Sequence, residues 1–296
     1  MIQTSEPSGP PLDDYGYPYA PDSRRRLRKQ SIRASKRAIN AAIYVCMSIL
    51  GGLLRLGRLG RRDLPLTPQS MHPRHILVIR LDLIGDLVLS TVIVRVLKRA
   101  YPKAEIDLLA LPSSAGIVQG DPDLSEIISY NPNVWRRPKA LVQPRNWLEA
   151  WRMVRRLRAR HYDIAVSVFG PWAAILAALS GARRRVGYGR EGYPGLLTDS
   201  VPGRHWQRGA RLHEVDYTLR LASAAGAIIQ ESDRVPHLTV PPQAQQEAAL
   251  LLEQVGISPG RPLIACHVSS NNGQSKRWPV PYWATLIDRL IRELHA

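Results

Sequence analysis

The 296 residues of this chain suffice for about two domains of ordinary size. A composition of 45% hydrophobic and 22% charged residues excludes a wholly disordered, collagen-like or multi-span membrane protein, and two distant cysteines, Cys46 and Cys266, exclude a disulfide scaffold and a cysteine-rich zinc site. The net charge of +17 is concentrated in residues 24–62 and 136–160, which favours an anionic partner such as a membrane surface or a nucleic acid.

Residues 1–70 are expected to lie outside the folded domains. The first 22 are rich in Pro, Ser, Gly and Asp, which predicts a disordered tail. The apolar stretch Ala38–Leu54 has 17 residues, which as a helix are shorter than the roughly 30 Å of a bilayer core. Flanking arginines favour a helix lying in the membrane interface; a true span and a poorly ordered basic arm are the alternatives.

Residues 71–240 predict one α/β domain, because runs of branched aliphatic residues alternate with longer segments of helical period. Strands are expected at His75–Leu81, Glu105–Ala110, Glu126–Tyr130, Asp163–Phe169 and Arg185–Tyr188, and helices at Gly85–Tyr101, Trp147–Arg160, Ala173–Ser180 and His213–Ala225. A long connection, residues 189–212, precedes the last of these helices. This alternation predicts a Rossmann-like, doubly wound parallel sheet, whose ligands bind beyond the carboxyl ends of its strands.

Residues 241–296 predict the start of a second Rossmann-like domain. After a proline-rich linker we expect a helix at Ala244–Val255, a strand at Arg261–Val268 and a helix at Val280–Leu294. One βα unit is too little for a complete domain, so we expect one whole sheet domain and an incomplete second one.

A carboxylate, Asp86, stands between the first predicted strand and its helix. The loop there has one glycine, Gly85, so it lacks the G-x-G-x-x-G and P-loop patterns, which disfavours a dinucleotide-dependent oxidoreductase. Two roles are open for Asp86. It acts as a general base on an incoming hydroxyl, or it binds only the amides of its own helix.

A polar loop follows the strand expected in the second domain. Ser269 and Ser270, with the adjacent cations Lys276 and Arg277, suit a diphosphate; alternatively the two cations only face solvent.

His213 and His267 suit catalysis or, as we prefer, structural hydrogen bonds. The pair Asp121 and Asp123 suits a divalent ion, but an Asp-Pro-Asp sequence is ordinary turn chemistry, and we expect no metal site.

Five blocks in this order resemble glycosyltransferase family 9, the ADP-heptose:lipopolysaccharide heptosyltransferases and their relatives. The resemblance runs from about residue 74 to the last residue. The blocks are residues 75–102, Arg155–Asp163, Gly181–Tyr188, His213–Tyr217, and Lys276–Pro279 after His267.

The resemblance implies a two-domain GT-B fold, with the acceptor bound by the N-terminal domain and a nucleotide-sugar donor by the C-terminal one. It implies inverting, metal-independent transfer of heptose or a related sugar from an ADP-heptose-like donor to a lipopolysaccharide core or another surface glycan, without a further cofactor. Together with the basic N-terminal segment, which we expect to bind the membrane, this predicts a cytoplasmic enzyme at the inner face of the inner membrane. Asp86 matches the family's proposed base and Lys276 its donor-phosphate lysine, with Arg80, Gly85 and His213 on the acceptor side.

The sequence departs from the family pattern in three places. Ser167-Val-Phe-Gly170 stands where Asp-Leu-x-Gly is common, and Ser269-Ser270 where Pro-Gly is usual. The later Asp-Ser/Thr-Gly-x-x-His block is absent, so we expect a fragment of a longer reading frame or a decayed, inactive transferase. The alternative to an enzyme is a basic protein that binds a membrane or a nucleic acid. The 6% aromatic content and the lack of a known motif disfavour nucleic acid as the partner.

Overall fold

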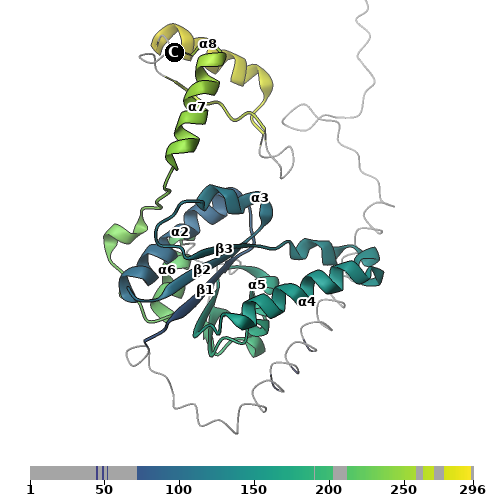
Figure 1. Ribbon diagram of the computed structural model, residues 1–296. Coiled ribbons are helices and arrows are strands. Elements are labelled where there is room, and N and C mark those ends of the chain that lie inside the picture. The colour runs from purple at the N-terminus through teal and green to yellow at the C-terminus, as the bar shows by residue number, and fades with distance from the viewer. Residues whose placement is uncertain are drawn as a thin grey trace, which may run out of the picture. The chain divides into compact units, whose positions relative to one another are not determined.

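A computed structural model describes residues 45, 49, 52, 72–189, 191–202, 212–257, 263–269 and 277–294. The chain divides into two units, Met1–Thr239 and Val240–Ala296, called unit 1 and unit 2 below (Figure 1). The predicted tail and interface helix of residues 1–70 lie outside the described residues, apart from Val45, Ile49 and Gly52, which are helical.

Unit 1 contains one parallel sheet of six strands in the order β3-β2-β1-β4-β5-β6. The strands are β1 (His75–Arg80), β2 (Glu105–Ala110), β3 (Glu126–Ser129), β4 (Ile164–Ser167), β5 (Arg184–Tyr188) and β6 (Asp199–Val201). The chain first builds outward from β1 through β2 to β3, then returns to the other side of β1 to place β4. The strand order therefore reverses between β1 and β4, which is where such sheets bind their ligands.

Helices cover both faces of this sheet (Figure 1). The α-helices of unit 1 are α2 (Ile84–Ala100), α3 (Pro112–Ala115), α4 (Pro144–Ala159), α5 (Gly170–Leu179) and α6 (Glu214–Ala224). Short 3₁₀ helices are η2 (Gly116–Val118), η3 (Pro132–Arg136), η4 (Pro138–Val142), η5 (Pro194–Leu196) and η6 (Glu231–Arg234).

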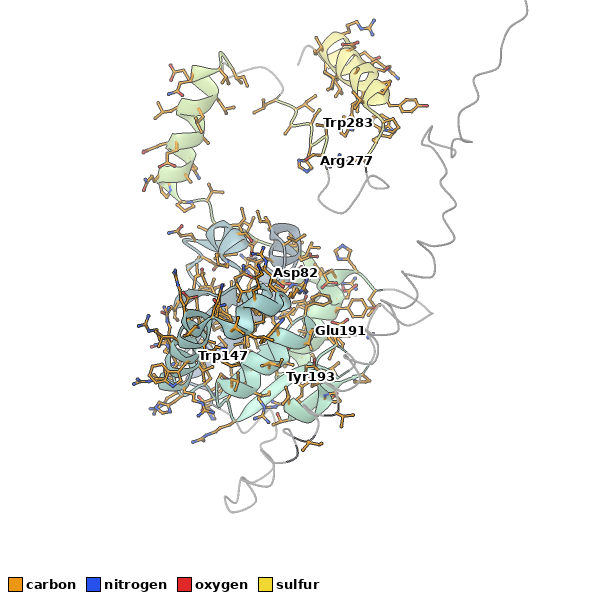
Figure 2. All side chains as sticks on the ribbon, turned by 90° about the vertical axis from the view of Figure 1, so that its right-hand side faces the viewer. Asp82, Trp147, Glu191, Tyr193, Arg277 and Trp283 are labelled. Carbon is orange, nitrogen blue, oxygen red and sulfur yellow. The ribbon has the colours of Figure 1, made fainter. Side chains whose placement is uncertain are left out.

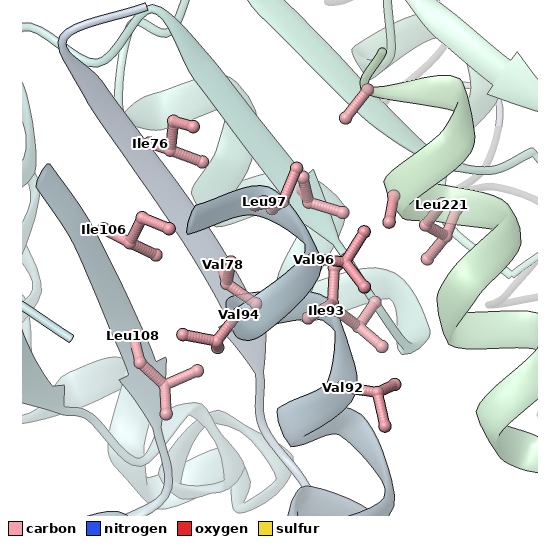
Figure 3. Packing of buried hydrophobic residues seen from close by; sticks show 14 of the residues in the cluster. Ile76, Val78, Val92, Ile93, Val94, Val96, Leu97, Ile106, Leu108 and Leu221 are labelled. Carbon is pink, nitrogen blue, oxygen red and sulfur yellow. The ribbon is translucent and has the colours of Figure 1, made fainter. Parts of the chain in front are cut away.

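Two hydrophobic cores lie on opposite faces of the sheet, because successive side chains of a strand point to opposite sides. Ile76 and Val78 of β1 pack with α2 and α6, and Figure 3 shows them beside α2 residues, with Leu221 of α6 close by. Leu77 and Ile79 pack with α4 and α5 on the other face. Each fully buried aliphatic side chain contributes about 2 kcal/mol, so β1 is held firmly from both sides and fixes the position of the loop that follows it.

The α/β alternation predicted for unit 1 is confirmed, with one strand added. β6 lies inside residues 189–212, which were expected to be a connection. Its three residues carry little hydrophobic pattern, and what holds them is tertiary: Arg184 of β5 donates to Asp199 at 2.9 Å, and the β6 backbone pairs with β5.

Unit 2 contains α7 (Pro242–Gln254) and α8 (Val280–Leu294), close to the predicted helices. The predicted strand differs: residues 263–269 are largely exposed and pair with no strand of the described chain. A strand is stable only when a neighbour satisfies its backbone groups, and the described residues of unit 2 provide none.

Candidate active site

The candidate site of unit 1 is built around Arg80, the last residue of β1, whose side chain is only 1% exposed. Its Nη1 lies 3.0 Å from Glu214 Oε1, and its Nη2 lies 3.5 Å from Asp82 Oδ2 and 3.6 Å from Asp86 Oδ1. The ring of Phe169, just after β4, lies 5.2 Å from the guanidinium carbon. One buried cation thus holds three carboxylates together at the strand-order reversal, where Figure 2 labels Asp82.

Asp86 occupies the first turn of α2, at the positive end of the helix dipole. No described backbone amide donates to its carboxylate, and α2 has no side-chain cap. The role of binding only its own helix amides is therefore not observed among the described residues. Its side chain is 42% exposed and so can be reached by a substrate.

The surroundings of Asp86 make its carboxylate a stronger base. Burial raises the pKa of Asp86, and the negative charges of Asp82 and Glu214 raise it further. The positive charge of Arg80 lowers the pKa of Asp86 but does not outweigh these effects. A carboxylate with a raised pKa in an accessible site is typical of a general base.

The N-termini of α2 and α6 meet at this site because the two helices pack side by side on one sheet face. Glu214 is the first residue of α6, and His213 caps that helix: its Nδ1 accepts from the Val215 amide at 3.3 Å. Gly85 is exposed, and a Cβ there would meet nothing within 4 Å, so packing does not require glycine.

Sequence reasoning selected Arg80, Asp86 and His213 but not Asp82, Glu214 or Phe169. Asp82 lies in the same loop as Asp86, and Glu214 follows His213 in one of the five blocks. Asp82 and Glu214 could therefore have been predicted as site residues from their charge and their closeness to selected positions. Phe169 could not be predicted from the sequence, because its contact with Arg80 depends on β4 lying next to β1.

The residues expected to bind a diphosphate belong to unit 2. Ser269 and Arg277 are exposed, as is His267, while Ser270 and Lys276 lie outside the described residues. The assignment of these four residues to the donor phosphate stays a prediction.

The Asp121–Asp123 pair forms a turn in which Asp121 Oδ1 accepts from the Asp123 amide at 3.0 Å. In the described part of the chain, no group of three or more His, Cys, Asp or Glu side chains is arranged to hold a metal ion.

Two of the five blocks contain hydrogen bonds that hold strands in place. In the block Arg155–Asp163, Arg160 donates to Asp107 Oδ2 of β2 at 2.8 Å, and the Tyr162 hydroxyl donates to the same oxygen at 2.6 Å. In the block Gly181–Tyr188, Arg184 donates to the carbonyl of Ala224 at 2.6 Å and so joins β5 to the end of α6.

Residues 150–295 match the family described as glycosyltransferase family 9 (heptosyltransferase). The chain is 29% identical over 223 residues to lipopolysaccharide heptosyltransferase 2 of Salmonella typhimurium, covering 74% of this chain and 60% of that protein. The chain thus spans about three fifths of the length of this curated relative.

Solved structures show the same fold. A family 9 glycosyltransferase from Veillonella parvula matches with a TM-score of 0.59 at 20% identity, covering 75% of this chain and 60% of that one. The ADP-heptose lipopolysaccharide heptosyltransferase II of Escherichia coli matches with a TM-score of 0.53 at 26% identity, covering 74% and 62%. The GT-B-like fold class expected from the sequence is therefore confirmed.

None of the helices that the structure describes has the length and hydropathy needed to cross a membrane.

Proposed function

We propose that this chain is an inverting glycosyltransferase whose unit 1 binds the acceptor, because its residues 150–295 match glycosyltransferase family 9. Its donor is a nucleotide sugar of the ADP-heptose type, and its acceptor is a lipopolysaccharide core or a related surface glycan. The names of its relatives, a lipopolysaccharide heptosyltransferase 2 and an ADP-heptose lipopolysaccharide heptosyltransferase II, support both assignments.

In this mechanism Asp86 accepts the proton of the acceptor hydroxyl as the oxygen attacks the anomeric carbon of the donor. The new glycosidic bond forms while the bond from the anomeric carbon to the diphosphate oxygen breaks, and the nucleoside diphosphate leaves with the electron pair. Ser269, Ser270, Lys276 and Arg277 bind the diphosphate, and the two cations stabilise its developing charge.

Arg80 and Glu214 position the base. Arg80 is buried and fixed by Glu214 at 3.0 Å, so its charge holds the Asp86 carboxylate at the start of α2 without covering it. His213 fixes the beginning of α6 and thereby the position of Glu214.

The position of Asp86 carries this proposal: its side chain is accessible where the strand order of the sheet reverses, and its raised pKa agrees with this role. Ligands of doubly wound sheets bind at this place, and a base of raised pKa is what proton removal from a hydroxyl requires.

Asp86→Asn tests the role of the base. Incubated with ADP-heptose and a heptose-terminated core acceptor, the variant should release ADP at least about a hundredfold more slowly than the unchanged protein, because an amide cannot take the proton. Binding of ADP, measured by calorimetry, should stay the same, since Asp86 does not contact the donor diphosphate in this mechanism.

Asp123→Asn is the matched control, because it makes the same chemical change in the turn at Asp121. It should keep normal turnover, whereas a metal-binding role of the Asp121–Asp123 pair requires it to lose activity. Near-normal turnover of Asp86→Asn would refute the base assignment, and an unchanged protein that neither transfers heptose nor binds ADP would refute the function itself.

The basic N-terminal segment is proposed to bind the protein to the cytoplasmic face of the inner membrane. Twelve basic and no acidic residues between Ser23 and Arg62 support this, because anionic lipids attract such segments. Removal of residues 1–65 should shift the protein from the membrane fraction to the soluble fraction of a cell lysate. Unchanged partition would exclude this segment as the main membrane anchor.

A further inference from the structure

A second surface of unit 1, distant in sequence from the N-terminal segment, exposes large apolar side chains. Trp147 is 56% exposed, Leu148 44% and Trp151 53%; Leu141 and Val142, which precede α4, are 55% and 80% exposed. These five residues are called the α4 face below. Exposed clusters of large apolar side chains are rare on folded domains and usually mark a binding surface for a protein, a membrane or a ligand.

The helix that carries this face is anchored by its opposite side. Met153 and Leu157 of α4 are buried in the core against the sheet. Residues four apart share one side of a helix, so Trp147, Trp151 and Arg155 form one outward row, and Leu148, Arg152 and Arg156 form the next. Each row therefore begins with an apolar residue and ends with arginine.

Local contacts hold the face in a defined shape. The Trp147 indole Nε1 donates to the Leu141 carbonyl at 2.9 Å, and its ring lies 4.8 Å from that of Trp135, edge to face. The guanidinium of Arg155 lies 4.7 Å from the centre of the Trp151 ring. Figure 2 labels Trp147 and Asp82 at separate places on unit 1. The face is thus preformed and separate from the candidate active site.

The charge around the face is almost entirely positive. Residues 136–160 contain nine basic residues and one acidic residue, Glu149, which pairs with Arg145 at 2.8 Å. Most of these arginines are exposed, including Arg136, Arg137 and Arg152. An occupant of this face must therefore present dense negative charge next to an apolar phase.

We propose that the α4 face docks onto the surface of a bilayer that contains anionic phospholipids. Tryptophan favours the boundary between headgroups and acyl chains, and arginine pairs with phosphate oxygens there. A protein partner would need an acidic surface that matches nine basic residues, whereas an anionic bilayer presents phosphates beside its acyl chains over its whole surface. A nucleic acid would satisfy the arginines but leave Leu141 and Val142 in water.

A fluorescent probe tests the contact in the full chain. Leu148→Cys, made together with Cys46→Ser and Cys266→Ser, places an environment-sensitive label on the face. With vesicles of phosphatidylcholine and phosphatidylglycerol its emission should shift to the blue, and with phosphatidylcholine alone it should not. Ser223→Cys in the same background is the control: Ser223 is exposed on α6, which packs on the opposite sheet face, so its label should not shift.

Charge reversal supplies a second measurement that does not need the label. Arg152→Glu should weaken partition onto the anionic vesicles by more than about tenfold, because it replaces an attraction by a repulsion. Arg220→Glu, the same change on an exposed arginine of α6, should weaken partition much less.

Three results would overturn the proposal. The first is vesicle binding of the chain while the label at position 148 stays in water, which assigns binding to another segment. The second is equal weakening by the two charge reversals. The third is a label that responds to RNA but not to anionic vesicles, which makes the face a nucleic-acid surface.

Discussion

One buried guanidinium organises the candidate active site at the scale of single residues. Arg80 has three carboxylates within 3.6 Å, so the cluster carries more negative than positive charge when all are ionised. Glu214 is closest to the guanidinium, and Asp86 is the most exposed of the three carboxylates. Asp86 is therefore both weakly compensated and accessible, which suits a group that must take up a proton.

The raised pKa of Asp86 predicts how stability depends on pH. A carboxyl whose pKa is higher in the folded than in the unfolded state stabilises the fold fully below its unfolded value of about 4, and this contribution is lost as the pH rises through the folded pKa. Asn does not titrate. The melting temperature of Asp86→Asn should therefore rise relative to that of the unchanged protein between acidic and neutral pH. A difference that is constant with pH would contradict the raised pKa.

At the scale of elements, α5 must fit closely against the loop after β5. Gly192 in this loop is so near α5 that an added Cβ would lie 2.6 Å from the Cβ of Ala174. α5 also begins directly after Phe169, whose ring covers the Arg80 guanidinium. The packing of α5 therefore contributes to the geometry of the site.

Gly192→Ala should destabilise unit 1 by about 1–3 kcal/mol, because the new methyl group forces the loop away from α5. Gly116→Ala is the matched control: Gly116 has helical backbone angles, and its Cβ would meet nothing within 4 Å. Its effect on the free energy of unfolding, measured with urea, should be neutral or slightly stabilising. Equal effects of the two substitutions would disprove the close approach.

The described hydrophobic core is unevenly distributed over the whole molecule. Both core clusters lie in unit 1, whereas no described residue of α7 or α8 is buried. The local free energy of opening depends on buried apolar contact, so unit 2 of this chain should open far more readily than unit 1.

Limited proteolysis should therefore remove unit 2 first and leave a resistant fragment that ends near residue 239. Mass spectrometry of the early fragments identifies the cleavage sites. Early cleavage within β1, α2 or α6 would show instead that unit 1 is not the stable part.

The sequence by itself determined the α/β alternation and the positions of β1 and α2, and it singled out Asp86 as the candidate base. Each rests on local information: a run of branched aliphatic residues, a helical period, or a carboxylate at a helix start. Arg160 and Arg184 also belong to recognisable blocks, but their role in tying strands to neighbouring elements was not evident from their spacing.

Only the tertiary structure decided which side chains surround Asp86. Glu214 is 134 residues from Arg80, and the two meet because α6 packs beside α2 on one sheet face. Phe169 reaches Arg80 because the chain returns to place β4 next to β1. Strand pairing across such distances depends on the summed packing of many residues, which no local pattern encodes. The same reason explains β6, whose three residues are held by β5 and Arg184 rather than by their own sequence.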